Sequence, residues 1–182
     1  MPVTVLGISG SLRKDSYNSA ALRAAAELAP EGLTVQTTGI GDLPLYNDDV
    51  RQSGYPAPVQ ALRDAVKQAD GLLIVTPEYN YSISGVLKNA IDWVSRPPEQ
   101  PFDGKPVAIM SVSPGIFGGA RAQYHLRQMF VYLNGDVLNR PEVMIGTCAS
   151  KFDKEGRLTD ETTRDFVRKL LQALQARIEQ RR

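Results

Sequence analysis

Short apolar runs alternate with helical patterns along the chain. Runs that are apolar throughout, or that alternate apolar and polar positions, predict strands at residues 3–8, 33–38, 71–76, 106–112 and within 136–145. Between the runs, apolar residues recur at helical spacing, which predicts helices near residues 18–28, 59–69, 84–94, 120–133 and 160–181. This alternation predicts a parallel sheet with helices on both faces.

Three of the predicted strands end in loops of unusual composition, after Ile8, Thr76 and Val112. Ligands of such sheets bind beyond the carboxyl ends of the strands, so these loops are where we expect function. Residues 39–58 are also rich in glycine and proline, and we interpret them as a loop rather than a domain boundary. The length of 182 residues suits a single domain spanning residues 1–182.

The first loop, residues 9–19, reads SGSLRKDSYNS and leads into a predicted helix. The first amides of a helix are unpaired and carry partial positive charge, so an anion fits there. Ser11, Ser16 and Asn18 offer neutral donors, and Arg13 adds a full charge for phosphate oxygens. The loop therefore predicts a phosphate site, with an ordinary turn capped by serines as the alternative.

Two nucleotide-binding motifs are missing from the sequence. Gly7 and Gly10 do not form G-x-G-x-x-G, and no G-x-x-x-x-G-K-[ST] is present. A dinucleotide fold and hydrolysis of ATP or GTP are therefore disfavoured. A hydroxyl-rich loop without a magnesium-binding signature suits a terminal monophosphate that stays bound.

The second loop, residues 76–85, reads TPEYNYSISG, and the third, residues 111–121, reads SVSPGIFGGAR. Aromatic side chains such as Tyr79 and Tyr81 can pack against a planar heterocycle. The glycines of the third loop allow close approach of a ligand to the backbone. The alternatives are a rigid turn with tyrosine packed on the core and a glycine-rich turn that caps a helix.

Composition narrows the possible partners. The net charge of +1 does not favour nucleic acid or an anionic membrane as a partner. The sequence shows neither a signal peptide nor a transmembrane run, so we expect a cytoplasmic protein. Cys148 has no second cysteine and no basic cluster nearby, so we predict that it is an inert buried thiol. His125, the one histidine, is interpreted as structural or exposed, while the roles of Arg121 and Tyr124 stay open.

Three segments in order resemble the NAD(P)H-dependent FMN reductase family, and the bacterial quinone and chromate reductases most closely. These are GSLR at residues 10–13 with Ser16 and Asn18, PEYNYS at residues 77–82, and LKNAIDW at residues 87–93. The likeness spans nearly the whole chain. It implies a flavodoxin-like three-layer fold with five parallel strands in the order 2-1-3-4-5.

The resemblance also implies a set of FMN-binding residues. The phosphate would be held by Ser11, Arg13, Ser16, Tyr17 and Asn18. The isoalloxazine ring would be lined by Pro77, Glu78, Tyr79, Asn80, Tyr81 and Ser82, with Ser113 and Gly115 beside it. Pro114 departs from the family pattern within the third loop.

By the same resemblance, hydride would pass from NAD(P)H to bound FMN and then to an acceptor such as a quinone, chromate, an azo compound or free flavin. The flavin would carry the chemistry, so no catalytic side chain and no metal are expected. Family members are usually dimers or tetramers. Two alternatives are an electron carrier without NAD(P)H turnover, which would tend to be strongly acidic, and a flavin-free signalling or binding domain.

Overall fold

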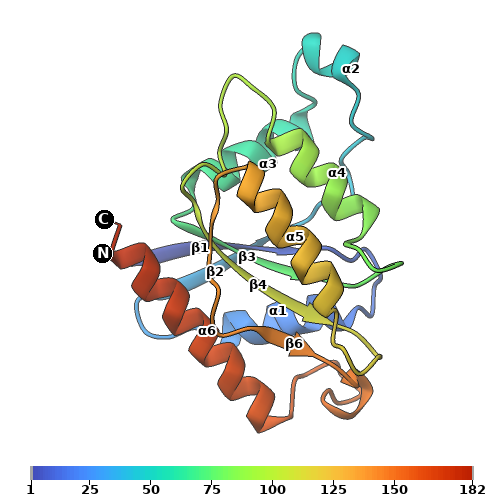
Figure 1. Cartoon of the computed structure of the whole chain (residues 1–182), viewed down its shortest axis with the longest axis vertical. Helices are drawn as coiled ribbons and strands as arrows, with labels where there is room; N and C mark the ends of the chain where they lie inside the picture. Colours follow the sequence, from blue (N-terminus) through green and yellow to red (C-terminus); the bar gives the residue numbers. More distant parts are fainter. Residues whose placement is uncertain (1, 182) are drawn as a thin grey trace.

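A parallel sheet forms the centre of the molecule in the computed structural model, which describes residues 2–181. Neighbouring strands follow the order β2-β1-β3-β4-β5, with β6 also paired to β4 (Figure 1). This confirms the predicted order. The strands are β1 (Val3–Ser9), β2 (Leu33–Thr38), β3 (Gly71–Thr76), β4 (Pro106–Val112), β5 (Asp136–Val137) and β6 (Val143–Ile145).

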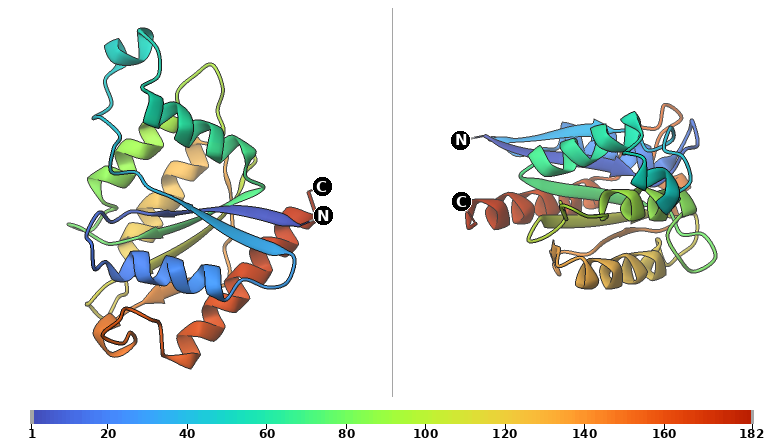
Figure 2. Two further views of the ribbon diagram at one scale, coloured as in Figure 1. Left: turned by 180° about the vertical axis from the view of Figure 1, so that it is seen from behind. Right: turned by 90° about the horizontal axis from the view of Figure 1, so that it is seen from above.

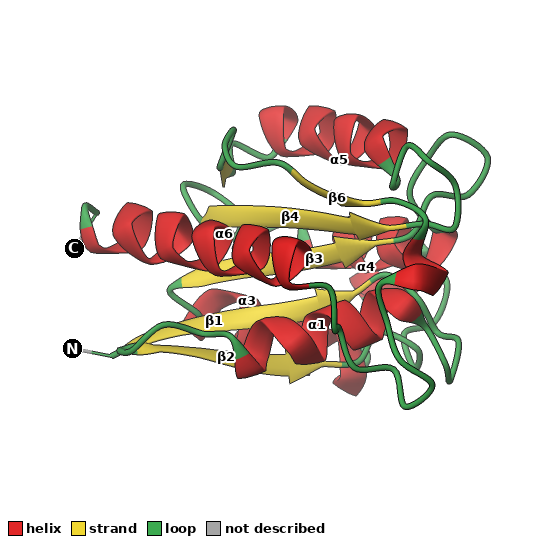
Figure 3. Cartoon of the chain, turned by 90° about the horizontal axis from the view of Figure 1, so that it is seen from below, coloured by secondary structure: helices red, strands yellow, loops and turns green. Residues whose placement is uncertain are grey.

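Helices cover both faces of this sheet, as predicted (Figure 3). They are α1 (Tyr17–Glu27), α2 (Asp48–Gln52), α3 (Ala57–Gln68), α4 (Gly85–Val94), α5 (Ala120–Tyr132) and α6 (Glu161–Glu179), with a 3₁₀ turn at Cys148–Ser150. One apolar core lies under α1 and α6, and the other under α3, α4 and α5. Within residues 2–181, none of the helices combines the length and apolarity needed to cross a membrane.

The central strands β3 and β4 are buried along their whole length, which explains their largely apolar sequences. Successive residues of β3 point to opposite cores: Leu73 packs with the α1 and α6 side, and Leu72 with the other. The two helical layers thus fix the sheet from both faces. The loops that follow the strands gather at its carboxyl edge (Figure 3).

The last strand position is divided in two. β5 pairs with the start of β4 at Pro106 and Val107, whereas β6 pairs with its end at Met110–Val112. Pro141 lies between them and has no N–H to donate to a ladder. The predicted strand within residues 136–145 is therefore present as two short pieces.

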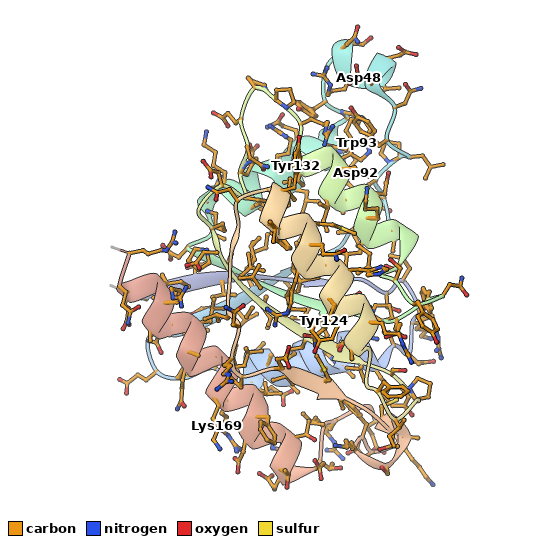
Figure 4. All side chains as sticks on the ribbon, viewed as in Figure 1. Asp48, Asp92, Trp93, Tyr124, Tyr132 and Lys169 are labelled. Atoms are coloured by element: carbon orange, nitrogen blue, oxygen red, sulfur yellow. The ribbon has the colours of Figure 1, made fainter. Side chains whose placement is uncertain are left out.

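Between β2 and α3 the chain extends away from the sheet and carries the short helix α2, while the last two residues of the predicted 39–58 loop already belong to α3 (Figure 1; Figure 2, left). We did not predict α2 because five residues are too few to show a helical period. The base of the segment is tied to α4, where Asn89 donates to the carbonyl of Pro44 at 2.9 Å and accepts from the amide of Tyr46 at 2.8 Å. Trp93, labelled in Figure 4, also donates to Pro44 at 2.8 Å. Asn89 and Trp93 of the LKNAIDW segment therefore hold the chain before α2 against α4.

Candidate functional site

The three loops meet in one pocket at the carboxyl edge of the sheet. Its lining combines the first loop, the start of the second, the start of the third and the turn after β6: Ser11, Arg13, Ser16, Tyr17, Asn18, Pro77, Glu78, Tyr79, Val112, Ser113, Pro114 and Cys148. The strand order of the sheet reverses at β1, which lies between β2 and β3. The helices α1 and α4, which follow β1 and β3, leave toward opposite faces of the sheet, so a crevice forms between these two strands and the loops meet there. A ligand there would touch all three loops.

The first loop opens α1 in the way its serines predict. Ser16 caps the helix, and its Oγ accepts from the amides of Asn18 at 3.2 Å and Ser19 at 3.4 Å. Ser11 is nearly buried, and its Oγ accepts from the amide of Arg13 at 3.4 Å. The Arg13 side chain is exposed and forms no ion pair with any residue in the range 2–181. Its charge is therefore available to an anion at the helix N-terminus.

Asn18 joins α1 to the end of β4. Its side chain is buried, donates to the carbonyl of Val112 at 3.2 Å and accepts from the amide of Val112 at 3.0 Å. These bonds satisfy two backbone groups at the point where β4 ends. Asn18 therefore fixes the distance between the first and third loops, and its contact with phosphate stays a prediction.

The second loop contains a tight turn from Tyr79 to Ser82. The amide of each of these residues donates to the carbonyl of the other, at 2.9 and 3.0 Å. Asn80 and Tyr81 occupy the centre with φ of 50° and 67°. Ser84, which caps α4, donates from Oγ to the carbonyl of Gly10 at 2.5 Å and so ties the second loop to the first.

Glu78 lines the pocket, but its carboxylate reaches the N-terminus of α5. Its Oε2 accepts from the amides of Arg121 at 3.1 Å and Ala122 at 3.4 Å. Its Oε1 lies 3.3 Å from the Arg121 guanidinium. The carboxylate thus meets both the helix N-terminus and a cation, so Glu78 holds the second loop against α5.

The third loop is held against β6 by buried hydrogen bonds. Ser111 donates from Oγ to the carbonyl of Gly118 at 2.5 Å and accepts from the Gln123 amide at 2.9 Å. Gln123 also donates to the carbonyl of Val143 at 2.8 Å. The amide of Ser113 donates to the carbonyl of Ile145 at 3.0 Å. The loop therefore has a fixed position at the rim of the pocket.

Not every residue named from the resemblance lines the pocket. Asn80, Tyr81, Ser82 and Gly115 lie in the same loops but outside its lining. Their contacts with a flavin stay predictions. Val112 and Pro114 also line the pocket, and the sequence did not indicate them. Their position depends on where the end of β4 meets α1, which no local pattern shows.

Cys148 is fully buried, as predicted, and it also belongs to the pocket wall. Burial raises the pKa of its thiol, and the nearby Arg13 acts in the opposite direction. Only the thiolate attacks electrophiles. We therefore expect a thiol reagent such as a disulfide dye to react with the folded protein roughly tenfold or more slowly than with the urea-unfolded protein.

The rate of colour release, measured with and without urea, checks this expectation. FMN should slow the reaction further, because Cys148 shares the pocket. Equal rates in the folded and unfolded protein would contradict the buried position of the thiol.

A family model described as NADPH-dependent FMN reductase matches residues 3–150, which include all three loops. The chain belongs to the NADPH-dependent FMN reductase family. An NAD(P)H-dependent FMN reductase of Pseudomonas aeruginosa is 57% identical over 173 residues, covering 95% of this chain and 94% of the relative. A quinone reductase of Escherichia coli is 50% identical over 166 residues, covering 90% of this chain and 88% of the relative.

A solved structure has the same fold. FerB, a flavoenzyme NAD(P)H:(acceptor) oxidoreductase from Paracoccus denitrificans, matches with a TM-score of 0.90 and 38% identity, covering 98% of each chain. Membership of the FMN reductase family confirms the resemblance and the flavodoxin-like fold. This protein is accordingly an oxidoreductase with FMN as cofactor and NAD(P)H as cosubstrate. The electron-carrier and flavin-free alternatives lose their support.

The pocket of this FMN reductase suits its cofactor. A helix N-terminus, serine hydroxyls and the exposed cation of Arg13 match a phosphate at one end. Pro77, Tyr79 and the third loop supply flat and apolar surface at the other end. His125, which was interpreted as structural or exposed, is exposed, and its Nδ1 lies 3.1 Å from the Ser82 hydroxyl.

Proposed function

We propose that this protein is an FMN-dependent NAD(P)H:quinone oxidoreductase. The observation that carries the proposal is that the first loop and Tyr79 of the second loop line the same pocket. The 50% identity to a quinone reductase over most of both chains supports a quinone as acceptor. Chromate, azo compounds and free flavin are further proposed acceptors, because Tyr79 at 48% exposure leaves the ring end accessible to molecules of different shapes.

The first loop holds the phosphate in this proposal. The hydroxyls of Ser11 and Ser16 donate to phosphate oxygens, the N-terminus of α1 adds partial positive charge, and Arg13 balances the charge of the phosphate. Tyr17 closes one side of the pocket. Asn18 keeps this loop in register with β4 through Val112.

The second and third loops orient the ring. Bound FMN would supply the hydride chemistry between NAD(P)H and the acceptor. Hydrogen bonds fix the loops around Glu78 and Gly115 and so place the backbone amides of these loops. The amides would stabilise negative charge on the reduced flavin ring without any rearrangement of the loops. The chain supplies binding, orientation and electrostatics, and no side chain is assigned as an acid, base or nucleophile.

The proposal is tested on the purified protein. We expect it to bind FMN, with flavin absorbance, and to oxidise NADPH or NADH in the presence of a quinone and without a partner protein. A panel of both nicotinamides against quinone, chromate, an azo dye and free FMN ranks the acceptors. A protein that neither binds added FMN nor oxidises NAD(P)H would overturn the proposal.

Replacing Arg13 by alanine tests the phosphate end. A charge-assisted hydrogen bond contributes about 1.5–3 kcal/mol, so we expect FMN affinity to fall about ten- to a hundredfold. Riboflavin lacks the phosphate, and its affinity should change little. Fluorescence titration of both flavins measures the two constants, and Lys14→Ala, in the exposed part of the same loop, is the matched control. An equal loss for both flavins would place Arg13 away from the phosphate.

We also propose that the protein forms a homodimer or homotetramer in the cytoplasm. Tyr124, Val131 and Tyr132 expose 52%, 82% and 87% of their surface on one stripe of α5, with Tyr124 and Tyr132 labelled in Figure 4. Exposed apolar and aromatic side chains of this kind suit contact with a second copy of the chain. Light scattering should show two or four times the mass of one chain, and a monomer at micromolar concentration would contradict the proposal.

A further inference from the structure

Arg121 is the residue on which the second and third loops both converge. Its guanidinium carbon lies 4.1 Å from the centre of the Tyr81 ring, which belongs to the second loop. It also lies 4.4 Å from the centre of the Phe117 ring, which belongs to the third loop. The cation therefore stacks between two aromatic rings from different loops.

The same residue is anchored at its other polar groups. Its side chain and its backbone amide both bind the carboxylate of Glu78. Arg121 thus has contacts to the pocket wall, to the exposed turn and to the third loop at once. Its partly exposed side chain is held by planar stacking and by a charge, a combination that lysine does not reproduce.

The turn that Arg121 contacts is strained. Tyr81 has a φ of 67°, a left-handed conformation that a bulky residue seldom adopts. Such a conformation persists where neighbouring contacts determine it. Tyr81 is 64% exposed, so little of the core holds it, and the Arg121 guanidinium stacks on its ring.

We propose that Arg121 is a positioning residue that locks the Tyr79–Ser82 turn and the third loop into one arrangement beside the flavin ring. The inference rests on the proposed FMN site, because the pocket is where both loops begin. Without the guanidinium, the two loops move independently and the ring end of the pocket loosens. The phosphate end is unaffected, since Asn18 ties the first loop to Val112 at the end of β4 and Ser84 ties it to the start of α4, and neither anchor lies in the segments that Arg121 holds.

Comparing the affinities for FMN and riboflavin distinguishes an effect at the ring end of the pocket from an effect at the phosphate end. We expect Arg121→Leu to weaken FMN and riboflavin by the same factor, about three- to tenfold, as two partly exposed cation–π contacts are lost. The ratio of the two affinities should therefore stay as in the wild type, whereas Arg13→Ala changes it. Arg121→Lys should give an intermediate loss, because lysine keeps the charge beside Glu78 but lacks the planar stack.

Amide hydrogen exchange tests the lock without flavin. The amides of Tyr79 and Ser82 in the turn, and of Gly118 and Ala120 at the third loop, are all hydrogen-bonded and report on each loop. In flavin-free Arg121→Leu we expect exchange at both places to rise by about three- to tenfold. Exchange in α2, far from Arg121, should be unchanged.

Arg96→Leu is the matched control, because Arg96 stacks on Tyr46 at 5.5 Å away from the pocket. It should alter neither flavin affinity nor exchange in the two loops. If Arg121→Leu does not fold, Phe117→Leu and Tyr81→Leu each remove one face of the stack and should produce the same exchange in both loops.

Several results would overturn the proposal. These are unchanged exchange in Arg121→Leu, faster exchange in only one loop, or a changed ratio of FMN to riboflavin affinity. A change of oligomeric state with unchanged exchange would also do so, since Arg121 would then act between chains. A wild-type protein that binds no FMN would contradict the proposed function, while the exchange experiment would still decide whether Arg121 locks the loops.

Discussion

Asn18→Leu is expected to lower the free energy of unfolding by about 2–6 kcal/mol. Leucine has a similar size but cannot pair with the amide and carbonyl of Val112, which Asn18 satisfies at 3.0 and 3.2 Å. A buried polar group left without a partner costs about 1–3 kcal/mol, and two are left here. Urea unfolding followed by the fluorescence of Trp93, the one tryptophan and a fully buried one, measures the change.

The same variant should lose FMN affinity, because the first and third loops are no longer held together across the pocket. Ser19→Ala is the matched control one position along α1. The Ser19 hydroxyl lies 2.9 Å from that of Ser9 in a half-buried site, so its loss should cost no more than about 1.5 kcal/mol. Equal stability of the two variants would show that the two hydrogen bonds to Val112 stabilise the fold no more than the bond between the Ser9 and Ser19 hydroxyls does.

Gly118→Ala is expected to be destabilising by a similar amount, about 2–5 kcal/mol. Gly118 has a φ of 58°, and a Cβ there would lie 2.7 Å from the carbonyl carbon of Met144 and 2.8 Å from the amide nitrogen of Gly146. These are backbone atoms, so relief requires the third loop to move off β6. The variant should therefore lose stability and flavin affinity together.

Gly115→Ala is the control in the same loop. A Cβ at Gly115 would meet only the Ser113 hydroxyl, at 3.6 Å, an ordinary van der Waals distance. Its effect on the unfolding midpoint should be small. If both alanine variants unfold at the same urea concentration, the third loop is not held against β6 as the hydrogen bonds of Ser111 and Gln123 indicate.

Local chemistry explains why much of the site could be predicted. Ser16 caps α1 because a serine before a helix satisfies its first amides, whatever the rest of the chain does. The tyrosines of the second loop follow a buried strand directly, and strand ends of a parallel sheet meet at one edge. The glycines of the third loop were predicted to let a ligand approach the backbone; at Gly118 the close neighbour is instead the backbone of β6, and approach of a ligand stays a prediction.

Other features depend on residues far apart in the chain. Asn18 and Val112 are separated by 94 positions, and Glu78 and Arg121 by 43, so no local pattern links them. Cys148 reaches the pocket wall only because β6 pairs with the end of β4. The role of Arg121 was open in the sequence for the same reason, since Tyr81, one of its two ring partners, lies 40 positions away in another loop.

The sequence by itself determined the alternation of strands and helices and the three loops, and it predicted a phosphate site in the first. These follow from the period of apolar residues and from side chains that act on their own neighbourhood. Only the tertiary structure decided which side chains line the pocket and which bond to other parts of the protein. That choice depends on distances between loops, and those are set by how α1, α5 and β6 pack on the sheet.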